Sequence, residues 1–67
     1  MNIEAERARK QLTMAALADQ LGICAKTYSE YVRGRTPIPS NVLIDMAKLF
    51  NCSTDYLLGI DTARHIS

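Results

Sequence analysis

The fold is decided by one stretch of the chain, TMAALADQLGICAKTYSEYVRG, which spans residues 13–34. Its first half places Leu17, Ala18 and Leu21 on one face of a helix, a spacing typical of a helix that packs against a core. Gly22 interrupts this pattern, and a second helical pattern begins shortly after it. The stretch therefore predicts two short helices joined by a tight turn.

The second helix of this stretch, residues 25–33, has two contrasting faces. Tyr28, Tyr31 and Val32 lie on one side at helical spacing. The other side carries short or polar side chains, which are Ala25, Lys26, Ser29, Glu30 and Arg33. A helix of this kind, braced by the helix before it, fits the major groove of B-DNA. The same periodicity is also typical of a helical hairpin in any small bundle, and periodicity alone does not separate the two interpretations.

This helix pair and the residues that follow it share several motifs with a known family. Within the stretch these are Ala18, the turn Leu21-Gly22-Ile23 and the closing pair Arg33-Gly34. Downstream they are Leu43, Met46-Ala47, Phe50-Asn51-Cys52-Ser53 and Asp55-Tyr56-Leu57-Leu58-Gly59. Together they resemble the Cro and phage-repressor-like (XRE-type) helix-turn-helix transcriptional regulators. The resemblance implies an all-α, compact five-helix bundle of the lambda-repressor-like DNA-binding type over residues 1–60, with residues 61–67 as a C-terminal tail or linker.

The resemblance implies sequence-specific binding to double-stranded DNA by helices two and three. The N-terminal turn of helix 25–33 would then bring several side chains to base edges, namely Ala25, Lys26, Thr27, Ser29 and Glu30. Lys26 can donate to guanine, Ala25 can touch a thymine methyl group, and Glu30 can accept from cytosine or repel phosphate. A phosphate contact is the alternative role for Lys26. The residues expected beside the DNA backbone are Thr13, Met14, Arg33 and Arg35.

The sequence departs from the family pattern at three positions. Met14 stands where the family commonly has a glutamine that contacts phosphate, and a thioether does not replace that hydrogen bond. Cys24 takes the place of a capping serine or threonine, and a thiol is a poor cap. Arg7 matches a family arginine that often pairs with a glutamate near the end of helix three, but Val32 occupies that position, so this ion pair is not expected.

The resemblance also implies a homodimer on a palindromic operator. One short recognition helix reads few base pairs, and such domains gain affinity by spanning two half-sites about one helical turn apart. The dimer surface expected on the fifth helix consists of Thr54, Tyr56 and Leu57.

No cofactor, metal or small-molecule substrate is expected. Cys24 and Cys52 are too few and too far apart for a zinc site, and His65 is the only histidine. Without a secretory signal both cysteines are expected to be reduced, a disulfide between them being the alternative.

The first helix is predicted over residues 3–10, with Ile3, Ala5 and Ala8 as its packing face. A glycine and two prolines predict a loop over residues 34–39.

The last two helices follow from caps and apolar spacing. Pro39 or Ser40 should begin the fourth helix, and Asn51 should end it. Its predicted core stripe is Leu43, Met46, Ala47 and Phe50. Ser53 is expected to cap a short fifth helix that ends before Gly59.

Composition fits one small, folded, soluble domain. The chain has 67 residues, of which 48% are hydrophobic and 22% charged. It contains neither the run of about 20 apolar residues that a membrane span needs nor a signal-peptide core, which predicts a cytoplasmic location. The net charge is only +1, but between residues 20 and 43 Glu30 is the sole acid, against Lys26, Arg33 and Arg35. This basic excess coincides with the proposed DNA face, chance clustering on a solvated surface being the alternative.

The sequence argues against an enzyme, because no nucleophile, base and orienting group are evident and a chain this short hardly forms a pocket. Its scattered acids are interpreted as solvated: Glu4, Glu6, Asp19, Asp45, Asp55 and Asp61. The predicted function is that of a transcriptional regulator, of the phage- or prophage-repressor type. The alternatives are a protein-interaction module, an antitoxin or a restriction-modification controller with the same fold.

Overall fold

The computed structural model describes residues 1–60, and this range contains five helices and no strand. The helices are α1 (Ile3–Arg9), α2 (Met14–Leu21), α3 (Ala25–Val32), α4 (Ser40–Phe50) and α5 (Thr54–Leu58). The all-α fold with a helix-turn-helix at α2 and α3 is therefore confirmed. The predicted tail, residues 61–67 with His65, lies outside the described residues.

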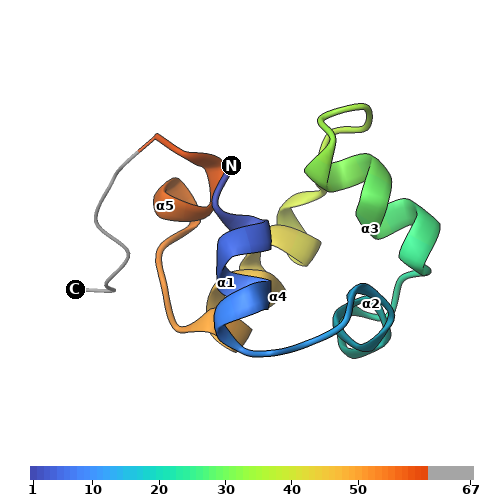
Figure 1. Cartoon of the computed structure of the whole chain (residues 1–67). Coiled ribbons are helices and arrows are strands. Elements are labelled where there is room, and N and C mark those ends of the chain that lie inside the picture. Colours follow the sequence, from blue (N-terminus) through green and yellow to red (C-terminus); the bar gives the residue numbers. More distant parts are fainter. Residues whose placement is uncertain (61–67) are drawn as a thin grey trace.

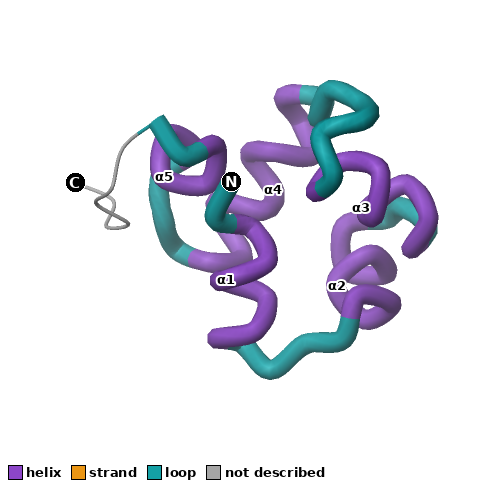
Figure 2. Tube along the Cα trace, turned by 45° about the horizontal axis from the view of Figure 1, so that its top comes forward, coloured by secondary structure: helices purple, strands orange, loops and turns teal. Residues whose placement is uncertain are grey.

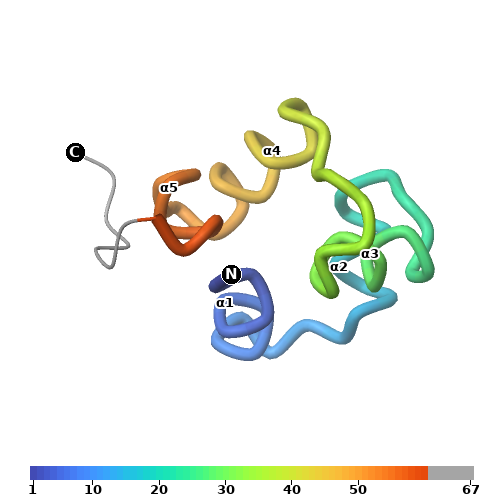
Figure 3. Tube along the Cα trace, turned by 90° about the horizontal axis from the view of Figure 1, so that it is seen from above, coloured from blue at the N-terminus to red at the C-terminus, as the bar shows by residue number. Residues whose placement is uncertain are grey.

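The helices are arranged so that α3 and α5 lie at opposite ends of the molecule. Helices α1 and α4 occupy the middle, α5 lies beside them on one side, and α2 and α3 lie on the other (Figure 1). The tilted view and the view from above show the same separation (Figures 2 and 3). The first turn of α3 is therefore remote from α5.

The turn between α2 and α3 is built from local signals that the sequence carries. The Thr13 hydroxyl accepts a hydrogen bond from the Ala16 N–H at 3.0 Å and so caps α2, as predicted. Gly22 ends the helix with φ of 72°. A Cβ atom there would meet no other atom within 4 Å, so backbone conformation, not space, is what favours glycine.

All five helices end in the same way. After each one, a residue with positive φ turns the chain, and two N–H groups reach back to carbonyls of the last turn, which is the Schellman arrangement. The five turning residues are Gln11, Gly22, Gly34, Asn51 and Gly59. Asn51 tolerates this conformation better than most side chains do, whereas Gln11 has no such advantage.

The packing face of α1 differs from the prediction. Ile3 is completely buried, but Ala5 and Ala8 are exposed, and Glu6 is buried with 2% exposure. The reason is a partner that helical spacing does not reveal, because the Tyr56 hydroxyl of α5 donates a hydrogen bond to Glu6 Oε2 at 3.1 Å. The interpretation of Glu6 as a solvated acid is therefore wrong.

The beginning of the chain is attached to α5. The Asn2 backbone N–H donates to the Leu57 carbonyl at 2.9 Å, and the Asn2 side-chain amide donates to the Tyr56 carbonyl at 2.6 Å. The first bond satisfies a carbonyl near the end of α5, and the second adds a donor to the Tyr56 carbonyl, which also accepts from the Gly59 N–H.

The buried face of α4 is also shifted slightly from the prediction. Met46, Ala47 and Phe50 are buried as expected, but Val42 is buried while Leu43 is only half-buried. Asn51 ends α4 and Ser53 caps α5, its hydroxyl accepting from the Tyr56 N–H at 3.1 Å. Both of these predictions are confirmed.

The core draws on every helix. Its buried apolar residues are Ile3, Leu17, Ala18, Tyr28, Tyr31, Val42, Met46, Ala47, Phe50, Cys52 and Leu57. Cys52 serves there as a small apolar side chain, while Cys24 is exposed, and no disulfide joins the two.

Candidate nucleic-acid interface

Helix α3 has one face in the core and one in solvent. Tyr28 is completely buried and Tyr31 is 6% exposed, so the two tyrosines fix the helix to the rest of the molecule. On the opposite side Ala25 and Lys26 are exposed at the N-terminal turn, and Arg33 is exposed just after the last turn. The side chains that remain free to meet a ligand are therefore mostly small or basic.

The other residues predicted to read bases are partly buried. Thr27, Ser29 and Glu30 each have intermediate exposure. Together with Ala25 and Lys26 they occupy one helix, so the structure brings all five predicted base-contacting residues onto α3.

At the beginning of α3, Cys24 does not cap the helix through its side chain. Its Sγ instead lies 3.0 Å from the Thr27 hydroxyl oxygen. The pKa of the Cys24 thiol is lowered, chiefly because the Thr27 hydroxyl can donate to the thiolate, with help from backbone N–H groups of the first turn. The Thr27 hydroxyl is thus engaged with Cys24 in the free protein.

Glu30 faces a base from the loop that follows α3. Its Oε2 lies 3.8 Å from Arg35 Nη1, and this buried oxygen accepts no hydrogen bond from residues 1–60. A backbone bond from the Arg35 N–H to the Glu30 carbonyl, 3.0 Å long, holds the two residues together. The carboxylate offsets part of the positive charge that Arg35 would present to a polyanion.

The start of α2 supplies the second group of predicted contacts. Thr13 and Met14 are both exposed there. The Thr13 hydroxyl accepts the capping bond, and the first turn of any helix leaves N–H groups without an intrahelical acceptor. Such N–H groups favour an anion, so this end of α2 suits a phosphate even though Met14 carries no polar group.

The predicted dimer residues of α5 differ in exposure. Thr54 and Tyr56 are half-buried, but Leu57 is completely buried in the core of the single chain. The exposed apolar side chains at this end of the molecule are instead Leu58 and Ile60, the latter 74% exposed. A five-residue helix is too short for sequence periodicity to tell which of two neighbouring leucines faces inward.

An open groove of about 460 Å³ lies between α4, α5 and the loop after α3, and its lining is mainly apolar, with Arg35 as its charged side chain. Within residues 1–60 no cluster of three or more metal-binding side chains occurs. The described helices include none that is both long and apolar enough to cross a membrane.

The fold and the outer face of α3 define a helix-turn-helix protein of the Cro/C1 type. Comparison of the sequence agrees, because residues 3–57 match the family described as Helix-turn-helix. The chain belongs to this family, as its motifs indicated.

Two curated relatives come from Bacillus subtilis strain 168. The chain is 35% identical to the uncharacterized HTH-type transcriptional regulator YobD over 54 residues, which are 81% of this chain and 48% of that protein. It is also 35% identical to the uncharacterized HTH-type transcriptional regulator YqaE over 57 residues, which are 85% of this chain and 49% of that protein. The chain spans about half the length of the curated relatives it matches.

Proposed function

We propose that the chain binds double-stranded DNA sequence-specifically, as the DNA-binding domain of a transcriptional regulator that acts in the cytoplasm. The observation that carries this proposal is the solvent-facing side of α3, where Ala25 and Lys26 project from the first turn while Tyr28 and Tyr31 anchor the opposite side. A helix held in this way enters the major groove with its N-terminal turn foremost. Membership of the helix-turn-helix family supports the same role.

The contacts divide between bases and backbone. Lys26 donates to guanine O6 or N7, and Ala25 and Ser29 lie near neighbouring base edges. Arg33 and Arg35, which are exposed beyond the end of α3, meet phosphates on one side, and Thr13 at the start of α2 meets them on the other. This division supports reading of a short half-site by each copy of the chain.

Two copies bind together on a palindromic operator, with α5 at the contact between them. The exposed apolar side chains Leu58 and Ile60, beside the half-buried Thr54 and Tyr56, favour this end of the molecule as the contact surface. By the resemblance of its motifs, the chain acts as a phage- or prophage-type repressor.

Selection from a random pool of duplexes at low salt tests DNA binding directly. We expect a preferred site with two symmetric half-sites, and an affinity that falls steeply as salt rises because phosphate contacts release counterions. Failure to bind any duplex at low salt would instead favour a protein-interaction module that uses the apolar groove. A selected site without symmetry would argue against the dimer while leaving DNA binding intact.

A further inference from the structure

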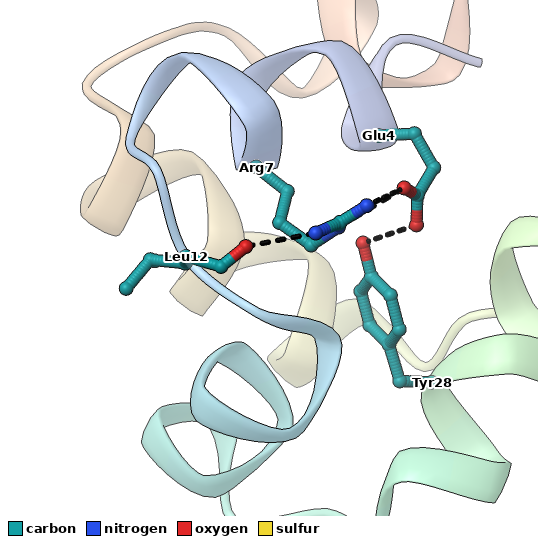
Figure 4. Close-up of polar contacts among 4 residues, drawn as sticks. All are labelled: Glu4, Arg7, Leu12 and Tyr28. Carbon is teal, nitrogen blue, oxygen red and sulfur yellow. Dashed lines mark hydrogen bonds and ion pairs between the residues drawn. The ribbon is translucent and has the colours of Figure 1, made fainter.

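A continuous chain of hydrogen bonds leads from α3 through α1 to the start of α2 (Figure 4). The Tyr28 hydroxyl donates to Glu4 Oε1 at 2.9 Å. Arg7 donates to Glu4 Oε2 from Nε at 3.0 Å and from Nη2 at 2.6 Å. Arg7 Nη1 then donates to the Leu12 carbonyl at 2.8 Å, one residue before the cap of α2. We call Tyr28, Glu4, Arg7 and the Leu12 carbonyl the polar chain.

The polar chain takes the place of the ion pair that the family pattern would put between Arg7 and the end of helix three. Each oxygen of Glu4 serves a different partner, so one carboxylate joins Tyr28 of α3 to Arg7 of α1. The guanidinium in turn uses its remaining edge on the segment between α1 and α2. Both helices of the helix-turn-helix are thereby tied to α1.

The protonation states of the polar chain are stable near neutral pH. Hydrogen bonding to Arg7 lowers the pKa of the Glu4 carboxyl group, which stays charged. Burial, and then the hydrogen bond to Glu4, raise the pKa of the Tyr28 hydroxyl, which remains a donor. Hydrogen bonds to charged groups are stronger than those between neutral groups, so the arrangement resists distortion.

We propose that the polar chain sets the orientation of α3 relative to α1 and α2, which makes Tyr28, Glu4 and Arg7 positioning residues for base recognition. The inference rests on the proposed function, because base recognition is what a correctly oriented α3 serves. Tyr28 projects from the buried side of α3 and is completely buried, so it acts on DNA only through the helix that carries Lys26 and Ser29.

Orientation matters more for base contacts than for phosphate contacts. A hydrogen bond to a base edge weakens steeply when its angle or length changes. Phosphate attraction depends on charge and tolerates a small rotation of the helix. Loss of the polar chain should therefore reduce discrimination between sites, whereas a purely structural defect would lower affinity for all duplexes alike.

The matched test compares Tyr28→Phe with Tyr31→Phe. Both tyrosines are buried on α3, less than one turn apart, but the Tyr31 hydroxyl makes no hydrogen bond within residues 1–60, so its removal is the control. For Tyr28→Phe we expect affinity for the selected duplex to fall about tenfold, comparable with one mismatched base pair, with unchanged affinity for an unrelated duplex. Tyr31→Phe should change neither affinity.

A second readout needs no DNA. Residual dipolar couplings of the amide groups in α1 and α3 report the angle between these helices in the free chain. They should change in Tyr28→Phe and stay constant in Tyr31→Phe. The Glu4→Ala variant should repeat the change, and Glu4→Gln should largely restore the angle, because its amide can accept from Arg7 while donating to the Tyr28 oxygen.

The outcomes separate the two proposals. If Tyr28→Phe and Glu4→Ala both keep the interhelical angle and the site preference, the positioning role is wrong. Equal losses on selected and unrelated duplexes would overturn it as well. If the unaltered chain binds no duplex, the proposed function fails, while the dipolar couplings still decide whether the polar chain orients α3.

Discussion

Lys26 is the one charged side chain in the first turn of α3, and it is exposed. Its replacement by alanine should cost about 1–3 kcal/mol of binding free energy on the preferred duplex and relax the preference at one base pair. The reason is that a lysine which donates to guanine contributes to one base position only. Competition binding with single-base variants of the selected site measures this effect.

The arginines beyond α3 provide the comparison. Arg33→Ala and Arg35→Ala should each weaken binding to all duplexes similarly and reduce the salt slope by about one. If Lys26→Ala behaves in the same way, Lys26 contacts phosphate and not a base.

In the free structure the Glu30 carboxylate already faces Arg35. The change Glu30→Gln should raise affinity for every duplex, by up to about fivefold, because removing a partly exposed ion pair frees the arginine for phosphate. Titration of selected and unrelated duplexes at one salt concentration checks this. A loss confined to sites with cytosine at one position would show instead that Glu30 reads that base.

The shared form of the five helix ends makes Gln11 unusual. Its φ of 58° places a side chain where glycine or asparagine stands at the ends of the other four helices. Gln11→Gly should therefore raise the free energy of unfolding by roughly 0.5–1 kcal/mol, since relief of the left-handed conformation exceeds the entropic cost of glycine. Urea denaturation of the two forms measures the difference.

The reverse change provides the control. Gly22→Ala adds a side chain at a φ of 72°, where no other atom lies within 4 Å of the new Cβ. It should therefore lower the free energy of unfolding only through the strain of a left-handed backbone conformation. If Gln11→Gly and the unaltered chain are equally stable, the left-handed conformation of Gln11 does not destabilise the end of α1.

Most helix boundaries were predictable because their signals are local. Thr13, Gly22, Asn51 and Ser53 act on the residues beside them, and each begins or ends a helix where the sequence indicated. The buried carboxylate of Glu6 was not predictable, because its partner lies 50 positions away in the sequence.

In the candidate site, too, local features were predictable from the sequence and contacts between distant residues were not. The outer residues of α3 follow from helical spacing, and the structure places them together on that helix. The tie from Tyr28 to Glu4 spans 24 positions and depends on how α1 meets α3, which no repeat in the sequence encodes. Likewise, only the packed structure distinguishes the buried Leu57 from the exposed Leu58.

The first turn of α3 and helix α5 lie at opposite ends of a body whose longest extent is 30 Å. Two copies that meet through α5 therefore hold their α3 helices on opposite sides of the contact, so that each helix can enter its own half-site. Leu58→Ser should weaken this contact, so that footprints at limiting protein shorten to one half-site while the base preference within it stays unchanged.

Sedimentation of the protein–DNA complex supplies the stoichiometry for this experiment. Two copies per duplex are expected for the unaltered chain, and a greater share of single copies for Leu58→Ser. A two-copy complex that is insensitive to Leu58→Ser would place the contact elsewhere on the molecule.

The attachment of Asn2 to the last turn of α5 brings the beginning of the chain and the end of its last described helix to one place, remote from the first turn of α3 (Figures 1 and 3). A fluorophore, purification tag or fused protein joined at Met1 would consequently lie away from Ala25 and Lys26, although beside the groove that Arg35 also lines. The added group would interfere sterically with contacts made by α5. Labelling at residue 1 should thus report on association between copies while leaving the base preference of the first turn of α3 unchanged.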